Sequence, residues 1–310
     1  MTLLRKAVDD YLAMRRALGF ELRLAGGMLR HFASFLEQQG ASHVTTDLAL
    51  RWAKRPVEVQ PAQWANRLGV VRRFAQFLSA SDQRTEIPPA GLLPFRYQRK
   101  PPYIYRDEEI ERLLRAAHRI QSSTGQRAAS YSTLIGLLAV TGLRISEALG
   151  LDDRDIDLTE GVLAIRRTKF GKSRLVPLHP STTGALRRYM RARDRILPVR
   201  PTDAFLVGEQ GRRLTEWTVR WTFVKLSREI GLRGPTDCRG PRLHDLRHRL
   251  AVRTLIGWYR RGVDVERRLP VLSTYLGHGH VTDTYWYLTA VPELLRLAAK
   301  RIGARRGLQP

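Results

Sequence analysis

Five short segments between residues 141 and 287 contain the residue types that transesterification of a phosphodiester would need. Such a reaction requires a nucleophile, cations that stabilise the pentavalent phosphorus, and an acid for the leaving oxygen. Tyrosine can serve as the nucleophile, arginine can hold two non-bridging oxygens, and lysine or histidine can donate the proton. The segments are Thr141-Gly-Leu-Arg-Ile-Ser-Glu147, Thr168-Lys-Phe-Gly-Lys-Ser-Arg174, His244-Asp-Leu-Arg247, Leu276-Gly-His278 and Tyr285-Trp-Tyr287.

The first segment places Arg144 after a predicted helix break at Gly142, with Glu147 three residues further on. This spacing fits an ordinary ion pair at the start of a helix. It also fits a carboxylate that orients Arg144 toward a phosphate. These residues alone leave both interpretations open.

The third segment places His244 and Arg247 three residues apart, so on a helix both side chains would lie on one face and could reach one phosphate. His244 and His248 are four apart, a spacing that could also bind a metal. However, no glutamate follows the first histidine as in zinc hydrolases, and no third ligand is obvious. We therefore expect no metal site here.

In two pairs of residues the spacing alone does not say which member is functional. Lys169 and Lys172 flank a predicted hairpin turn, where a lysine is usually just solvated. Tyr285 and Tyr287 lie two apart on a predicted helix, which rotates one about 200° from the other. Only one of the two tyrosines can therefore face a given phosphate, and a single helical tyrosine is more often a packing residue.

The composition indicates a folded protein with a polyanionic partner. Lys and Arg outnumber Asp and Glu by 54 to 29 among 310 residues, which gives a net charge of +25, while 43% of the residues are hydrophobic. Binding a polyanion releases its counterions, and this drives association of basic proteins with nucleic acids. A single cysteine, Cys238, excludes an intramolecular disulfide. With no signal-peptide core and no membrane-length apolar stretch, we expect a cytoplasmic location and no membrane partner.

The charge and the proline pattern divide the chain into two predicted domains. Residues 1–95 carry 13 basic and 8 acidic side chains, so most of the positive charge belongs to the remainder. Residues 96–104 are basic and contain prolines, which favours an extended linker. We therefore predict a helical domain at 1–95 and a second domain at 105–310.

Apolar periodicity predicts four helices in the first domain, with Thr46 as the cap of the third. In the second domain it predicts a helix opening at Asp107, a buried helix over 131–140, and a hairpin of two strands over 161–167 and 174–178. Further helices are expected near 182–195, 215–230, 244–256, 268–276, 282–288 and 291–302. No P-loop or dinucleotide fingerprint is present, so we expect no cofactor.

In this order and with these gaps, the five segments resemble the catalytic domain of the tyrosine recombinase (phage integrase) family. The resemblance implies a mainly α fold with a small antiparallel β-sheet. It implies that Tyr287, nine residues after His278, is the nucleophile, and that Tyr285 packs with Trp286. The other catalytic residues implied are Arg144 and Arg247 for the phosphate, His244 and His278 assisting, Glu147 as the supporting carboxylate, and Lys169 as the acid, with Lys172 in reserve.

The resemblance also implies a partner and an assembly. Members of this family close a helical core-binding domain and the catalytic domain around double-stranded DNA. They act as tetramers on their recombination sites, so we expect a homo-tetramer, or a hetero-tetramer with a related recombinase, associated with the nucleoid. The helix after Tyr287 could pack on its own domain or dock on a neighbouring subunit. The expected DNA contacts are Arg67, Arg72, Arg73, Lys172, Arg174 and Arg249.

We expect no arm-binding domain before the helical domain, and therefore a Xer-like or transposon-borne recombinase that forms and resolves Holliday junctions. Two alternatives remain open. A type IB topoisomerase would use the same groups but reseal the same strand. A DNA-binding architectural protein without catalysis would use only the basic surface, although it would have no need for Tyr287 in register with His278.

Overall fold

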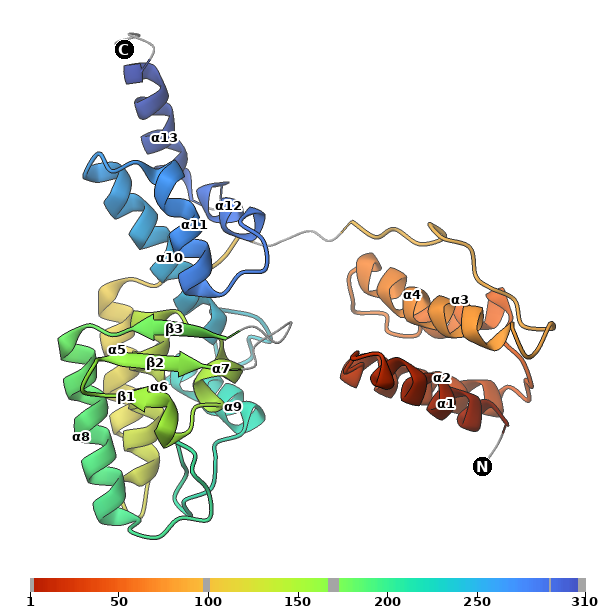
Figure 1. The fold of residues 1–310 in the computed structure, drawn as a ribbon, viewed down its shortest axis with the longest axis horizontal. Helices are drawn as coiled ribbons and strands as arrows, with labels where there is room; N and C mark the ends of the chain where they lie inside the picture. The colour runs from red at the N-terminus through yellow and green to blue at the C-terminus, as the bar shows by residue number, and fades with distance from the viewer. Residues whose placement is uncertain (1–2, 97–100, 167–172, 290, 306–310) are drawn as a thin grey trace. The chain divides into compact units, whose positions relative to one another are not determined.

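The computed structural model describes residues 3–96, 101–166, 173–289 and 291–305. The chain divides into two compact units, residues 1–100 and 101–310, and this division falls within the segment predicted as a linker. Figure 1 shows the two units, each with its own packed elements. No helix in the described ranges is long and apolar enough to cross a membrane.

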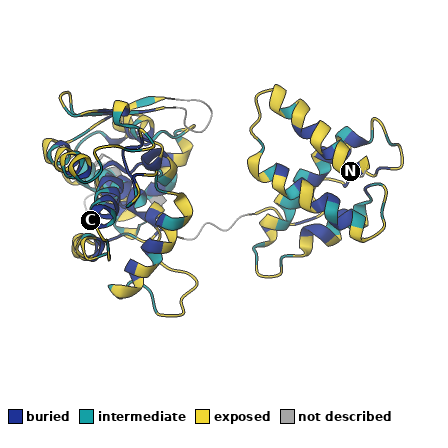
Figure 2. Ribbon diagram, turned by 90° about the horizontal axis from the view of Figure 1, so that it is seen from below, coloured by how far each residue is buried: buried dark blue, intermediate teal, exposed yellow. Residues whose placement is uncertain are grey.

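The first unit is a bundle of the helices that the apolar periodicity predicts. Their bounds are α1 Leu3–Ala17, α2 Arg23–Gln38, α3 Thr46–Lys54 and α4 Pro61–Leu78. One face of each helix packs inward around the fully buried Trp52, as the dark blue inner faces in Figure 2 show. The predicted cap of α3 is off by one residue. Thr45 is the cap, because its hydroxyl accepts from the backbone N–H of Leu48 at 3.3 Å.

The second unit is mainly helical with a small antiparallel sheet, as expected. Its strands are β1 Ile156–Asp157, β2 Val162–Ile165 and β3 Arg174–Pro177, in the order β1-β2-β3. Leu163 lies opposite Val176, and both side chains are buried. The hairpin of β2 and β3 is confirmed. Strand β1 was not predicted, because two residues are too few to show an alternating pattern.

A buried helix, α6 (Gln126–Thr141), forms the centre of this unit. It packs against α5 (Asp107–His118), α8 (Pro180–Ile196) and α10 (Leu243–Arg260). It ends at Gly142, which adopts a left-handed conformation with φ 63°. A side chain there would be strained and would also clash, because a Cβ would lie 2.8 Å from Leu250. The turn that follows leads directly to Arg144.

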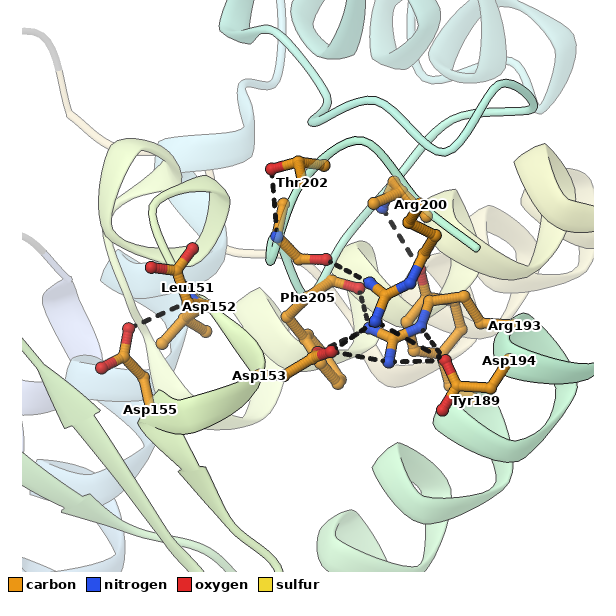
Figure 3. A network of polar contacts seen from close by, with 12 residues as sticks. Leu151, Asp152, Asp153, Asp155, Tyr189, Arg193, Asp194, Arg200, Thr202 and Phe205 are labelled. Carbon is orange, nitrogen blue, oxygen red and sulfur yellow. Dashed lines mark hydrogen bonds and ion pairs between the residues drawn. The ribbon is translucent and has the colours of Figure 1, made fainter. Parts of the chain in front are cut away.

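A network of charged side chains holds the end of α8 against the segment that precedes β1 (Figure 3). Arg193, which is fully buried, donates to both carboxylate oxygens of Asp153 at 2.7 and 3.0 Å and to Asp194 at 2.8 Å. Arg200 donates to Asp153 at 2.6 Å. Arg193 also donates to the carbonyl of Phe205 at 2.8 Å. The network joins α8, the segment before β1 and the segment around residue 205.

The C-terminal helices form a further core on α10. They are α11 Val265–Leu276, α12 Thr282–Thr289 and α13 Pro292–Arg305. Within the described ranges, α7 (Ile145–Leu149) and α9 (Glu216–Glu229) complete the α-helices of this unit, and Asp153–Asp155 form a short 3-10 helix. In this single chain α13 packs on its own unit, where Leu294 is fully buried. Glu293 pairs with Arg260 at 2.6 Å, which fixes the start of α13 on α10.

Candidate active site

The start of α7 presents Arg144 together with Glu147. Glu147 accepts from the backbone N–H of Arg144 at 2.9 Å and from its guanidinium at 2.8 Å. The predicted ion pair is therefore present, and it also closes the first turn of α7. The other end of the guanidinium donates to the carbonyl of Gly277 at 2.9 Å. Arg144 keeps 28% of its side chain exposed, so it can still meet a ligand.

Arg247 on α10 is held in the same place by backbone carbonyls. It donates to the carbonyl of Gly142 at 2.8 Å and to that of Leu276 at 2.5 Å. Leu276 and Gly277 are consecutive, so the end of α11 anchors both arginines. Burial, followed by the charge of Arg144, lowers the pKa of Arg247 to about 10. The guanidinium remains charged at neutral pH, and two cations lie close together.

Tyr287 on α12 is buried beside Arg247. Only 3% of its surface is exposed, and its ring stacks with that of His278 at 6.0 Å between centroids. Burial raises the pKa of its phenol, while the charge of Arg247 and a hydrogen bond with it act in the opposite direction. Tyr285, by contrast, is 52% exposed. The expectation that Tyr285 packs is wrong, and it is Trp286 that packs against His248 and Tyr287.

The rings of His248 and His278 lie beside this tyrosine, and the ring of His244 lies beside that of His248. Burial, followed by the charge of Arg247, lowers the pKa of His278 to about 4, and its Nδ1 is 2.7 Å from the hydroxyl of Thr284. Burial also lowers the pKa of His248 to about 3. The pKa of His244 is lowered as well, but we expect a smaller shift than for His248 and His278, because His244 is more exposed than they are. At neutral pH these rings can accept or donate hydrogen bonds without adding charge.

His248 is a residue that motif reasoning considered only as a metal ligand. Its ring lies 4.7 Å from that of His244, 5.3 Å from that of Trp286 and 5.4 Å from that of Tyr287, between centroids. Its buried Nδ1 has no hydrogen-bond partner within the described residues. Among those residues no group of three or more His, Cys, Asp or Glu side chains could hold a metal ion.

Several predicted DNA contacts are engaged within the protein. Arg174 pairs with Glu147, and Arg249 pairs with Asp107 and donates to the carbonyl of Tyr105. Arg67 donates to the carbonyls of Trp52 and Ala53. Arg174 and Arg249 are about nine-tenths buried and have internal partners, and their contact with DNA stays a prediction. The sequence did not predict these internal partners, because in a strongly basic chain the residue type does not distinguish a paired arginine from an exposed one.

The remaining predicted contacts differ in how they are placed. Arg73 is exposed on α4, and Arg72 beside it is half-buried. Lys169 and Lys172 lie outside the described residues, so the choice between them stays a prediction.

Comparison with known proteins agrees with this geometry. The sequence model of the phage integrase family matches residues 104–293. The chain is 50% identical to the putative integrase/recombinase y4rB of Sinorhizobium fredii, with 98% of each chain covered. It is 32% identical to the tyrosine recombinase XerD of Caulobacter vibrioides, over 76% of this chain and 73% of that one.

Solved structures show the same fold at low sequence identity. The integrase of transposon Tn1549 in complex with a circular intermediate DNA is 17% identical, with a TM-score of 0.65 over 97% of this chain and all of that one. A lambda integrase tetramer bound to a Holliday junction is also 17% identical, with a TM-score of 0.62 over 92% of this chain and 76% of that one. The protein belongs to the phage integrase family and is a tyrosine recombinase, an enzyme that transfers DNA strands through a tyrosine.

Proposed function

We propose that the chain recombines double-stranded DNA at specific sites and that Tyr287 is its nucleophile. The observation that carries this assignment is the burial of Tyr287 against Arg247, with Arg144 anchored on the neighbouring peptide. A tyrosine needs a positive, preorganised environment to attack a phosphate. Tyr285, the other tyrosine of the motif, is exposed.

In the proposed reaction, the phenolic oxygen of Tyr287 attacks the scissile phosphorus. The guanidiniums of Arg144 and Arg247 bind the non-bridging oxygens, and their charge stabilises the pentavalent transition state. The neutral rings of His244 and His278 assist, by accepting the proton that the phenol of Tyr287 loses as it attacks and by hydrogen bonding. Lys169 protonates the departing 5′-oxygen. The products are a 3′-phosphotyrosyl link and a free 5′-hydroxyl. The phosphotyrosyl link conserves the energy of the broken bond for rejoining.

The proposed assembly is a tetramer on two DNA sites, in which the free 5′-hydroxyl of one strand attacks the link on its partner and produces a Holliday junction. The support is the fold shared with a lambda integrase that was solved as a tetramer on such a junction. The same chain could form the whole tetramer or share it with a related recombinase. The helical unit at 1–100 would contribute DNA contacts, with the exposed Arg73 as a candidate.

Trapping of the covalent intermediate tests the nucleophile. Duplexes made from the sequences that flank the gene are incubated with the protein, and a protein–DNA adduct is sought by denaturing electrophoresis. Tyr287→Phe should abolish the adduct with little change in DNA affinity, because only the attacking oxygen is lost. Tyr285→Phe is the matched control and should keep the adduct. Survival of the adduct in Tyr287→Phe would refute the assignment.

The acid can be tested with a substrate that does not need one. A 5′-bridging phosphorothiolate releases a thiolate, which leaves without protonation. Cleavage by Lys169→Ala should therefore be restored on this substrate, while Lys172→Ala should respond little. The opposite result would assign the acid to Lys172.

Relaxation and recombination assays separate the proposed function from that of a type IB topoisomerase. A recombinase joins two different sites in one mixture, whereas a topoisomerase only relaxes supercoils.

The salt dependence of DNA affinity provides a separate test of DNA binding. Each phosphate neutralised should add roughly 0.9 to the slope of log affinity against log salt. Residues 1–95 alone, with 13 basic and 8 acidic side chains, should bind with a shallower slope than the full chain.

A further inference from the structure

Arg174, at the start of β3, is held at the site by three hydrogen bonds to other residues of the protein. Its guanidinium donates to both carboxylate oxygens of Glu147, at 3.0 and 2.8 Å. Its Nε donates to the carbonyl of Tyr275 at 2.9 Å. The side chain is only 9% exposed, and the side chain of Glu147 only 5%. Such a bidentate, desolvated pair fixes the geometry of both partners.

The same guanidinium also lies against Gly277. Gly277 has φ +68°, and a Cβ on this residue would lie 2.6 Å from Nη1 of Arg174. Two features therefore favour glycine at this position: the left-handed backbone conformation and the lack of space for a side chain. The carbonyl of Gly277 accepts from Arg144, so Arg174 packs directly on the peptide that holds Arg144.

These contacts make two routes from Arg174 to Arg144. One runs through Glu147, which holds the backbone and the guanidinium of Arg144. The other runs through the end of α11, from the carbonyl of Tyr275 to that of Gly277. Because β3 packs against α11, the strand, the end of α11 and the start of α7 are joined at one side chain. A shift of Arg174 would move both supports of Arg144 at once.

We infer that Arg174 is a positioning residue, which holds Glu147 and the Gly277 peptide so that Arg144 meets the scissile phosphate in the right geometry. The inference rests on the proposed function of Arg144. It differs from a DNA contact, since the guanidinium of Arg174 is committed to Glu147 and Tyr275 within the protein. Arg174 would thus act on the phosphate through Glu147 and Arg144, without contacting it.

A conservative substitution tests this role. Arg174→Lys keeps the charge but cannot make the bidentate pair together with the bond to Tyr275. In single-turnover cleavage of duplexes from the gene's flanks, the adduct should form at least about tenfold more slowly, because small misplacements of catalytic groups are costly. The dissociation constant and its salt slope should stay at their wild-type values. The matched control is Arg200→Lys, since Arg200 also donates to a carboxylate and a carbonyl, and its side chain is 15% exposed.

A double-mutant cycle distinguishes positioning from independent action. If Arg174 works through Arg144, Arg174→Lys should change the rate less than about twofold once Arg144→Gln is present. Additive losses, or a salt slope reduced by roughly 0.9 with weaker binding, would overturn the inference and indicate a phosphate contact. If Arg174→Lys does not fold, Glu147→Gln provides the same cycle, because it keeps both guanidiniums while weakening their pairing.

Adduct formation by the wild-type protein distinguishes a failure of the positioning role from a failure of the proposed function. An adduct that requires Tyr287, with Arg174→Lys cleaving at the wild-type rate, would refute the positioning role alone. Absence of any adduct from the wild-type protein on the flanking duplexes would refute the proposed function, and the positioning role with it.

Discussion

Two clusters of arginines in the second unit differ in the number of carboxylates that neutralise them. In the cluster of Figure 3, Arg193 and Arg200 face two carboxylates, those of Asp153 and Asp194. In the active site, Arg144 and Arg174 share a single carboxylate, that of Glu147, and also donate to backbone carbonyls. Arg247 donates to the carbonyls of Gly142 and Leu276 and forms a hydrogen bond with Tyr287. The first cluster is balanced in charge, whereas the second has two more cations than anions.

The pKa shifts follow this difference. Burial lowers the pKa of Arg193, but the hydrogen bonds that it donates to Asp153 and Asp194 outweigh this and leave the pKa above its ordinary value. Burial and the charge of Arg144 lower the pKa of Arg247 to about 10. A buried cation without its own carboxylate is costly unless another anion compensates it. The balanced cluster therefore serves the fold, and the unbalanced one is suited to binding a phosphate.

The largest expected effect concerns cleavage. Arg247→Gln should slow adduct formation by on the order of a hundredfold or more, the loss typical of one preorganised donor to a transition state. Arg200→Lys, in the balanced cluster, should cleave at the wild-type rate. The measurement is single-turnover adduct formation. Equal losses in both variants would break the distinction between the clusters.

The order of effects should reverse for stability. Arg193→Gln removes the cation from two carboxylates and from the carbonyl of Phe205, so it should lower the free energy of unfolding by roughly 2–3 kcal/mol. Arg247→Gln should lower it less, because it also removes repulsion from Arg144. Chemical denaturation of each variant would measure the two values. A larger loss in Arg247→Gln would mean that its carbonyl contacts dominate.

A smaller effect is expected from simple anions. Sulfate binding to the active site should stabilise the wild-type protein by about 1.4 kcal/mol at roughly ten times its dissociation constant. The stabilisation should shrink in Arg144→Gln and remain in Arg200→Lys. Thermal unfolding against sulfate concentration provides the measurement. An undiminished response in Arg144→Gln would place the bound sulfate elsewhere on the basic surface.

The smallest effect concerns acid stability. The pKa of His248 is lowered to about 3 in the fold by burial and by His244, Arg242, Arg247 and His278, so the unfolded chain binds the proton first. The associated stability is present above the unfolded pKa of about 6.5 and is lost as the pH falls toward the folded value. His248→Gln should flatten the pH dependence of the melting temperature between about pH 6.5 and 5, by a few degrees at most. His118→Gln, on an exposed position of α5, should leave the dependence unchanged.

Much of the fold was predictable because its signals are local. The stripe of Leu4, Val8 and Leu12 predicts α1, and all three side chains are buried as expected. The apolar run ending at Gly142 predicts a buried helix and its break, since a glycine there permits the left-handed turn. Short elements such as β1 were not predicted, because two residues are too few to show an alternating pattern of apolar and polar side chains.

The candidate site divides in the same way. The prediction of Arg144, Arg247, His278 and Tyr287 needed the five motifs taken together and their resemblance to a known family, because each motif alone left another interpretation open. Which arginines face a ligand and which hold the fold could not be predicted, since Arg174, Arg193 and Arg249 carry the same charge. Only the packing of α7, β3 and α11 around Glu147 and Gly277 distinguishes them, because it decides which guanidiniums already have partners.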